Sequence, residues 1–511
     1  MEITLHKYLG KHQNIIHCVG SGEDAVWTWI AMELAEGGDL FDKIEADEGV
    51  GEDVAHFYFT QLIGAVSYMH SKGVAHRDIK PENVLLSAEG DLKLADFGLA
   101  ALFHRNGQAR LCNTVCGSPP YIAPEIISGR RSRRLDVLDA GYAANISDIW
   151  SCGVVLFVLL VGNTPWDEPT RCSDEFREYV DTGGRTTDEL WRKLPADILS
   201  LLRGMLKLDP ATRFSLDEIR THPWFTRRNP YLSPAGTSAN PVGLATQMLS
   251  SLRIDFGAEV AAAHQASASA QSPPGEVDAM DLEPVPDTSR PTATGGAHLL
   301  SSTQPETPLS DVPFDWERPP RLALYDGLSA SQPVASVSHP ISHPHAHIAP
   351  VSQETLDRLS DDPCLSQFTP QPGVPLSLTQ AARHFADIVP AHSLARFLSP
   401  LPLRLLLPLL AEALHRLGVP VPASAAASAT AASASASGSG YAEDEEWQER
   451  WIRVKTVDGR KQGLNGHVVV ERVGGELVEV RFVKASGDPL EWRRFFKKVV
   501  VLCRDVVLVP G

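Results

Sequence analysis

The 511-residue sequence has few cysteines and no long apolar run. Its seven cysteines are scattered without the paired CxxC spacing of a zinc site, which indicates a reducing compartment and no disulfide framework. The most apolar run, residues 154–161, is too short to span a bilayer, and the first residues do not resemble a signal peptide. Lys and Arg (46) are outnumbered by Asp and Glu (63), and the net charge of −17 argues against direct nucleic-acid binding. We therefore expect neither membranes nor nucleic acids as direct partners.

One stretch of eight residues, 76–83 with the sequence HRDIKPEN, is typical of phosphoryl-transfer chemistry. Such a transfer requires positioning and charge neutralisation more than covalent chemistry. Asp78 is expected to orient the substrate hydroxyl and accept its proton, and Lys80 to neutralise charge on the transferred phosphoryl group. Asn83 would hold a magnesium ion, and Arg77 would brace the loop. A charged surface turn with this spelling by chance is the alternative, which the downstream motifs disfavour.

Two partner motifs follow this loop. Asp96 begins an Asp-Phe-Gly triplet after the alternating run 92–95, which predicts a strand that delivers a carboxylate to a magnesium ion. Glu125 ends an Ala-Pro-Glu triplet, and the segment between the two motifs contains no Asp or Glu. Residues 1–226 therefore resemble a eukaryotic protein kinase domain, and the ending at 80–83 resembles Ser/Thr kinases rather than Tyr kinases. The resemblance implies ATP and Mg²⁺ as cofactors and proteins as substrates.

The same resemblance reveals an absence at the start of the sequence. Neither a glycine-rich loop over the phosphates nor a strand lysine occurs there, and Glu2 matches the helix glutamate that should pair with that lysine. Three explanations compete: an incomplete sequence or misassigned start, a pseudokinase, and a lineage-specific shortened enzyme. A missing half-sheet would expose aggregation-prone strand edges, which favours the first. Weak or absent phosphotransfer is expected of residues 1–511 alone.

The nucleotide pocket is expected at the junction of the two kinase lobes. Residues 26–32 alternate like a buried strand and lead into a Gly-Gly turn, which resembles the hinge. Alone, such a pair indicates only a turn, but its distance from the catalytic loop favours a hinge. Backbone groups of Glu33 and Ala35 would pair with adenine, and Asp39 would lie near the ribose. The expected ATP-binding residues are Glu2, Met32, Glu33, Ala35, Asp39 and Leu85.

The other motif residues divide between substrate binding and scaffold. Ser118 lies in a segment that resembles the substrate-receiving loop, where it would hydrogen-bond Asp78 and Lys80. Glu82 and Asp39 would line the path of substrate residues before the phosphoacceptor, which implies a preference for Arg three positions upstream. The residues expected to be structural are Arg77, Glu125, Asp148 and Arg213, of which Arg213 would pair with Glu125 and Asp148 would hold the catalytic loop.

Residues 227–385 are rich in Pro, Ser, Thr, Ala and His and lose strong periodicity, which predicts a disordered regulatory linker. Six Ser/Thr-Gln pairs indicate phosphorylation by kinases that recognise this dipeptide, although abundant Ser and Thr also allow a chance origin. A basic run near residues 130–134 indicates a solvated insertion or, less favoured, a nuclear import signal.

Residues 386–511 predict a small α+β kinase-associated regulatory domain, with an Ala/Ser-rich insertion at 423–440. Runs at 466–473 and 476–483, joined by two glycines, predict a β-hairpin. The stretch that begins at residue 491 predicts an amphipathic helix with a basic face.

Over nearly its full length the chain resembles the family of DNA-damage checkpoint effector Ser/Thr kinases that act downstream of ATR-type kinases. The resemblance is carried by the hinge sequence at 37–45, the GDPLEWRRF motif at 487–495, and the two segments around Thr303 and Ser331 that match regulatory phosphosites. It implies an α+β protein kinase-like fold with a truncated N-lobe and mainly helical C-lobe, followed by the linker and the small domain.

The resemblance also implies transfer of the ATP γ-phosphate to proteins in checkpoint signalling and cell-cycle arrest. The implied partners are an upstream Ser/Thr-Gln-directed kinase and a checkpoint adaptor, and the implied location is the nucleus and also the cytoplasm. A catalytically impaired fragment or pseudokinase that acts as an adaptor is the alternative.

Charge and reach predict how this enzyme is regulated. A flexible linker of about 150 residues spans roughly 60–75 Å, so the C-terminal domain can fold back on the kinase domain. The basic face, consisting of Arg493, Arg494, Lys497 and Lys498, would meet an acidic kinase domain. We expect autoinhibition by residues 441–511 that phosphates at Thr303 and Ser331 relieve.

Overall fold

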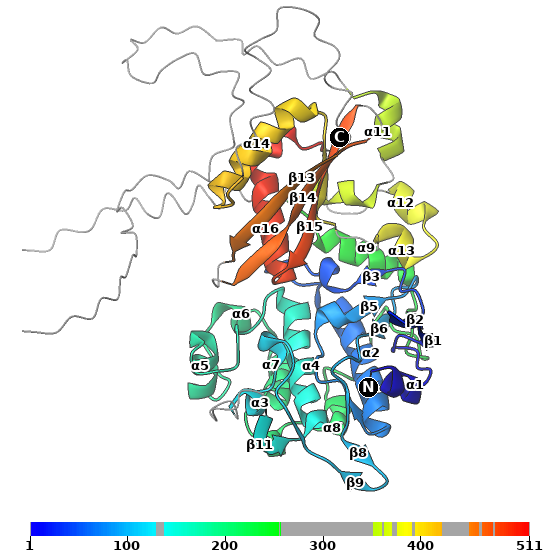
Figure 1. Ribbon diagram of the computed structural model, residues 1–511, viewed down its shortest axis with the longest axis vertical. Coiled ribbons are helices and arrows are strands. Elements are labelled where there is room, and N and C mark those ends of the chain that lie inside the picture. Colours follow the sequence, from blue (N-terminus) through cyan, green and yellow to red (C-terminus); the bar gives the residue numbers. More distant parts are fainter. Residues whose placement is uncertain are drawn as a thin grey trace, which may run out of the picture.

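The computed structural model describes residues 2–128, 137–254, 256, 351–359, 362–369, 376–390, 394–421, 449–458, 462–473 and 476–509. Thr303, Ser331 and the tract at 423–440 lie outside the described residues. The described chain forms two stacked bodies, a kinase domain of residues 2–254 and a C-terminal domain of residues 351–509 (Figure 1).

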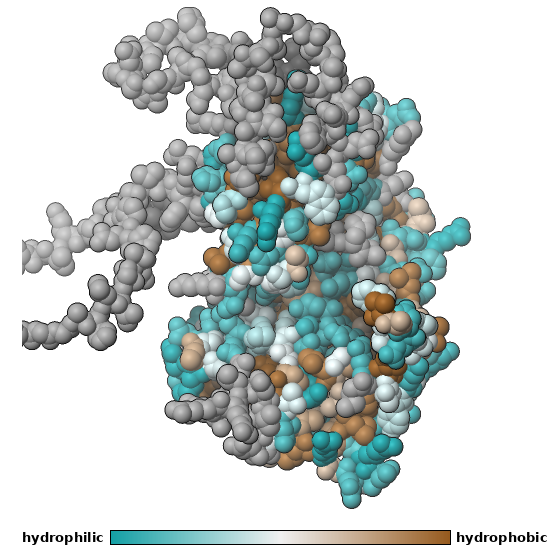
Figure 2. All heavy atoms as spheres, viewed as in Figure 1, coloured by the Kyte–Doolittle hydropathy of each residue, from teal (hydrophilic) through white to brown (hydrophobic). Residues whose placement is uncertain are grey.

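The N-terminal part of the kinase domain contains one helix and a hairpin. Helix α1 (Glu2–Leu9) precedes strand β1 (Cys18–Glu23), which pairs antiparallel with β2 (Thr28–Met32). Alternation at 26–32 predicted a buried strand, but Trp29 is 51% and Met32 49% exposed. Within the described residues β2 pairs with β1 alone, so a strand of buried-strand composition stays open to solvent. Apolar residues are visible on this edge of the kinase domain in Figure 2.

The larger part is organised around two long helices. α2 (Glu52–Ser71) packs against α4 (Ala144–Val161). α4 extends well beyond the apolar run at 154–161, and by length and composition its 18 residues could cross a membrane. However, 83% of that helix is buried within the protein, so its apolar side chains form the core of the domain.

Short elements complete the kinase domain. A three-stranded sheet in the order β3-β5-β6 joins the hinge to the residues that follow the catalytic loop. The strands are β3 (Gly38–Asp39), β4 (Val74–Ala75), β5 (Val84–Leu86), β6 (Leu92–Leu94), β7 (Ala101–Leu102), β8 (His104–Arg105), β9 (Gln108–Ala109), β10 (Cys112–Thr114) and β11 (Val137–Tyr142). The helices are α3 (Pro124–Ser128), α5 (Asp174–Asp181), α6 (Glu189–Arg192), α7 (Ala196–Met205) and α8 (Leu216–Thr221), with the 3-10 turn η1 (Phe41–Lys43) after β3.

Both ends of the range 227–385, predicted to be a disordered linker, contain folded elements. α9 (Pro241–Ser251) buries Leu244 and Met248 in the kinase core. Further along the chain follow α11 (Gln353–Leu359), η8 (Pro363–Phe368), α12 (Leu376–Ala381) and α13 (Phe385–Ile388). These elements are short and Pro-flanked, and their few apolar side chains become buried only against distant parts of the fold, so local composition did not reveal them. The prediction of disorder therefore needs correction at both ends.

The C-terminal domain is an antiparallel sheet packed on two helices. Its strands follow the order β12-β15-β14-β13. They are β12 (Arg396–Ser399), β13 (Glu449–Val457), β14 (Gly463–Val473) and β15 (Leu477–Ser486), with helices α14 (Leu403–Arg416) and α16 (Pro489–Leu502). β14 and β15 confirm the predicted hairpin, and α16 confirms the predicted helix, capped by the Asp488 carboxylate that accepts from Leu490 N at 2.8 Å.

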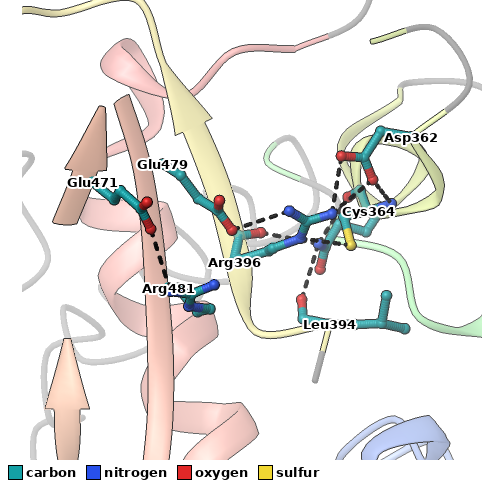
Figure 3. A network of polar contacts seen from close by, with 8 residues as sticks. Asp362, Cys364, Leu394, Arg396, Glu471, Glu479 and Arg481 are labelled. Atoms are coloured by element: carbon teal, nitrogen blue, oxygen red, sulfur yellow. Dashed lines mark hydrogen bonds and ion pairs between the residues drawn. The ribbon is translucent and has the colours of Figure 1, made fainter. Parts of the chain in front are cut away.

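A polar network attaches η8 to this sheet (Figure 3). The Arg396 guanidinium, on β12, donates to both carboxylate oxygens of Asp362 at 3.0 and 2.9 Å and to Glu479 Oε1 at 3.0 Å. Its Nε also donates to Cys364 Sγ at 3.0 Å. Arg396 thus holds residues 362–364 against the edge of the sheet. Strand β12, to which Arg396 belongs, begins more than 30 residues after them in the sequence.

Candidate active site

The catalytic loop is held by one buried carboxylate. Asp148, on α4, accepts from the backbone N–H groups of His76 and Arg77, both at 2.9 Å, and contacts His70 Nε2 at 2.8 Å. Arg77 has φ +69°, a left-handed conformation that costs free energy unless its surroundings hold it. Asp148 supplies that restraint, at the position where the sequence predicted a structural aspartate.

Three predicted residues converge on the Asp78 carboxylate. Its Oδ1 accepts from Ser118 N at 3.0 Å and Ser118 Oγ at 2.9 Å, while Oδ2 lies 2.9 Å from Lys80 Nζ and 3.2 Å from Asn83 Nδ2. Lys80 also donates to Ser118 Oγ at 2.7 Å, so both hydrogen bonds expected of Ser118 are present. Burial disfavours the anion, but Lys80 and Ser118 outweigh it and hold the pKa of Asp78 below its usual value. An ionised carboxylate can accept a hydrogen bond from a hydroxyl.

The predicted magnesium residues lie on the two loops that follow β4 and β6. Asn83 donates from Nδ2 to Asp78 O at 2.8 Å, and Asp96, at φ +62°, accepts from Gly98 N at 3.1 Å. A Cβ on Gly98 would lie 3.1 Å from Asp96 Oδ1 and 3.6 Å from Glu2 Oε2, so both carboxylates face this glycine. The described residues contain no cluster of three or more His, Cys, Asp or Glu side chains that could hold a metal. One amide and one carboxylate fit Mg²⁺, which keeps waters and phosphate oxygens as its other ligands.

The predicted hinge residues follow β2. Glu33 N donates to His17 O at 3.0 Å and the Glu33 carboxylate pairs with Lys93 at 2.8 Å, while Ala35 O accepts from Gly38 N at 3.1 Å. Leu85 on β5 is opposite Asp39 on β3 in the sheet. Asp39 and Leu85 therefore lie on neighbouring strands beside the hinge. The half-exposed side chain of Met32 has little packing around it among the described residues.

Two acids on the substrate side are poorly solvated. Burial, and next Asp42, raise the pKa of Asp39 to about 7, although the N–H of Phe41 opposes this. Burial also raises the pKa of Glu82, and its Oε2 has no hydrogen-bond partner among the described residues. The charges of Lys80 and Lys484 oppose this rise in the pKa of Glu82, whereas that of Asp488 adds to it, so two residues of the C-terminal domain act on Glu82 with opposite signs.

The scaffold pair predicted between Glu125 and Arg213 is bidentate. Arg213 Nη1 and Nη2 donate to the two Glu125 oxygens at 2.8 and 2.9 Å. The same guanidinium donates to the carbonyls of Ile146 and Lys207 and lies over the Trp150 ring. It therefore links the end of the activation segment to α4.

The C-terminal domain contacts the kinase domain through the predicted basic helix. Arg493, on α16, lies 3.1 Å from Glu45 Oε2, and Lys497 Nζ lies 3.1 Å from Glu45 Oε1. Arg494 forms two hydrogen bonds with Asp47, at 2.6 and 2.8 Å. Lys498, the fourth member of the predicted basic face, instead lines a hollow of the C-terminal domain with Arg494 and Glu491.

Sequence reasoning assigned no role to Glu45, Asp47 or Tyr142. Glu45 is fully buried. Its position within the hinge motif was the only sequence feature that could have indicated a role for it. Tyr142 reaches the catalytic loop from the insertion before α4, and no local pattern indicates that contact. The contacts of Glu45 and Tyr142 join segments that are far apart in the sequence, so local sequence patterns do not indicate them.

A buried aspartate beside Lys80 and Ser118, and an activation segment tied to α4 through the Glu125–Arg213 pair, are features of a protein kinase domain. The protein kinase domain family model matches residues 1–225, and the predicted α+β kinase fold is confirmed. Because of its similarity to full-length relatives, the chain belongs to the Chk1 family of serine/threonine-protein kinases.

Three fungal relatives carry this assignment. The chain is 36% identical to serine/threonine-protein kinase chk1 of Schizosaccharomyces pombe, over 98% of this chain and 85% of that protein. It is 32% identical to CHK1 of Saccharomyces cerevisiae, over 100% and 88%. It is 34% identical to CHK1 of Mycosarcoma maydis, over 92% and 76%. The predicted checkpoint Ser/Thr kinase is thus confirmed at the level of family and enzyme class.

Proposed function

We propose that the chain transfers the γ-phosphate of Mg-ATP to serine and threonine hydroxyls of proteins in DNA-damage checkpoint signalling. The observation that carries the proposal is the Asp78 carboxylate, which stays ionised between Lys80 and Ser118. Asp78 orients the incoming hydroxyl, and Lys80 neutralises the transferred charge. Asn83 and Asp96 hold the magnesium ion, while Glu2, Met32, Glu33, Ala35, Asp39 and Leu85 surround the nucleotide.

The test is phosphotransfer by a fusion in which a glycine-rich loop and a strand lysine precede residues 1–511. Asp78→Ala should lower kcat by about 10²–10⁴-fold, the usual contribution of a positioned general base. Asp174→Ala, at an exposed site on α5, is the matched control and should retain full activity. Substantial turnover by the purified Asp78→Ala protein would refute the assignment. A wild-type fusion that binds no nucleotide would favour the adaptor function instead.

We further propose that the substrates carry Arg three positions before the phosphoacceptor. Glu82 and Asp39 are two partly desolvated acids beside the catalytic loop, and a guanidinium would offset the cost of their burial. Glu82→Gln should reduce kcat/KM about tenfold or more for a peptide with Arg at that position, because a buried charge-assisted contact is lost. A peptide with Ala there should not distinguish Glu82→Gln from wild type, and equal losses for both peptides would exclude the assignment.

The contact between the domains supports autoinhibition as the mode of regulation. Lys484 and Asp488 of the C-terminal domain both act on the Glu82 carboxylate, and α16 lies on the 43–47 segment that follows the hinge. In this arrangement α16 packs on η1, directly after Asp39, and the C-terminal domain would hinder access of a basic substrate to Asp39 and Glu82. An upstream Ser/Thr-Gln-directed kinase would relieve the inhibition at Thr303 and Ser331, with recruitment by a checkpoint adaptor in the nucleus, and also in the cytoplasm.

Phosphorylation by that upstream kinase offers a direct test of this regulation. The fusion protein should gain activity after treatment with a Ser/Thr-Gln-directed kinase, whereas the Thr303→Ala, Ser331→Ala double variant should not respond. A double variant that is activated as strongly as wild type would show that other sites carry the signal.

A further inference from the structure

The insertion that precedes α4 pairs with the activation segment. Strand β11 lies antiparallel to β10, with Cys112 opposite Tyr142 and Thr114 opposite Val137. Gly141 has φ +67°, and a Cβ there would lie 2.5 Å from Asn113 Oδ1 and 2.9 Å from Leu111 Cβ. Only glycine therefore permits the two strands to approach this closely.

Tyr142 extends this pairing into the catalytic centre. Its side chain is buried, and its hydroxyl donates to Thr114 O at 3.1 Å and lies 3.7 Å from Cys116 Sγ. The same phenol interacts electrostatically with the Arg77 guanidinium. Arg77 Nε in turn donates to Leu99 O at 2.6 Å, directly after the Asp-Phe-Gly triplet. One phenol thus connects the catalytic loop and the magnesium loop to the activation segment.

The activation segment itself carries no acidic side chain that could pair with Arg77. Residues 97–123 contain no Asp or Glu, so the segment offers Arg77 no carboxylate. In many kinases the corresponding segment is ordered when a phosphate on it pairs with arginine. Burial, and next Cys116, raise the pKa of the Tyr142 phenol, which therefore stays neutral at physiological pH.

We propose that Tyr142 is a positioning residue, which holds the substrate loop beside Asp78. Its hydroxyl donates to Thr114 O, and four residues later Ser118 binds Asp78 through both N and Oγ. The hydrogen bonds of Tyr142 therefore fix the segment just before the residue that lines the catalytic aspartate.

Amide hydrogen exchange of the full chain tests the contact without any need for phosphotransfer. Tyr142→Phe removes only the hydroxyl and keeps the ring. Tyr179→Phe is the matched control, because the Tyr179 hydroxyl is also buried and donates to a backbone carbonyl, that of Leu206, at 3.0 Å. Exchange at residues 112–118 should accelerate about fivefold in Tyr142→Phe, the factor expected for one net hydrogen bond, and should stay unchanged in Tyr179→Phe.

Kinetics of the fusion with the N-lobe start provide a second readout. Tyr142→Phe should raise KM for the peptide about fivefold with KM for ATP unchanged, since the hydroxyl supports the substrate loop and not the hinge. Tyr179→Phe should alter neither constant. Unchanged exchange at 112–118 in Tyr142→Phe, or equal acceleration in both variants, would overturn the proposal. A rise in KM for ATP equal to that for the peptide would also overturn it, because it would indicate a general loss of structure.

Discussion

Replacing Arg493 by alanine should separate the two domains far more than loss of the neighbouring Arg494. The Arg493 side chain is 9% exposed and faces the fully buried Glu45 carboxylate, whereas Arg494 faces Asp47, which is 52% exposed. Removal of one partner from a buried pair costs about 3–5 kcal/mol, and Lys497 beside Glu45 places Arg493→Ala near the lower limit. An exposed pair contributes about 0.5–1 kcal/mol.

The assay measures association after the chain is cut at a protease site placed within residues 257–350. Arg493→Ala should raise the dissociation constant of the two parts about 100-fold, and Arg494→Ala about two- to fivefold. Arg481→Ala is the control, because its ion pair with Glu471 lies within the C-terminal domain and should leave association unchanged. Thermal melting of each part checks that the substitution has not unfolded it.

Equal weakening by Arg493→Ala and Arg494→Ala would refute the argument from burial. The phosphotransfer assay supplies the functional half of the test. Under autoinhibition, activity should rise most in Arg493→Ala, less in Arg494→Ala and not at all in Arg481→Ala. Lost association without increased activity would show that the C-terminal domain localises the kinase and does not inhibit it.

Three further outcomes are expected. The folded-state pKa of Asp39 is about 7, above the ordinary aspartate value, so protonation of Asp39 stabilises the folded state. This contribution to the free energy of unfolding is complete below about pH 4 and is lost as the pH rises to 7. Asp39→Asn should remove this slope from urea-unfolding curves, and should also abolish the fall in KM for an Arg-containing peptide between pH 6 and 8. Arg396→Met should lower the free energy of unfolding of the C-terminal domain by about 2 kcal/mol, because Asp362 and Glu479 lose their shared guanidinium; a melting point unchanged from wild type would contradict this. Arg213→Lys should destabilise the kinase domain by about 2 kcal/mol in denaturant titrations, since an ammonium group cannot form the two parallel bonds to the carboxylate; full stability would show the fork to be dispensable.

The catalytic centre was predictable because its residues lie in short motifs with fixed spacing. The catalytic-loop residues lie close together in the sequence, at Asp78, Lys80 and Asn83. Their mutual contacts therefore follow from local geometry. Ser118 is 40 residues away, but its motif still allowed its hydrogen bonds to Asp78 and Lys80 to be predicted. The catalytic roles of these residues remain predictions until activity is measured.

The contacts between distant segments were not predictable in the same way. α9 shows only a short apolar pattern in a Pro- and Ser-rich context, and it becomes a helix in the fold because the kinase core buries Leu244 and Met248. Glu45 and Arg493 are more than 400 residues apart, and nothing in either local sequence specifies the other. The exposure of β2 also depends on which strands lie beside it, and alternation alone carries no information about that.

A hydrogen bond from Ile254 N to Gln367 O, at 2.8 Å, joins the two ends of the chain segment that connects the domains. Arg253 adds a second bond, to Thr369 O at 3.0 Å, so residues 253–254 and 367–369 close a ring of chain at the domain boundary. The intervening residues therefore do not set the separation of the two domains. Doubling the length of such a ring costs only about 0.6 kcal/mol, because closure entropy grows with the logarithm of length. Insertions and deletions between residues 257 and 350 should accordingly leave the domain contact almost unaffected, and the spacing of Thr303 and Ser331 from the kinase domain is open to evolutionary change.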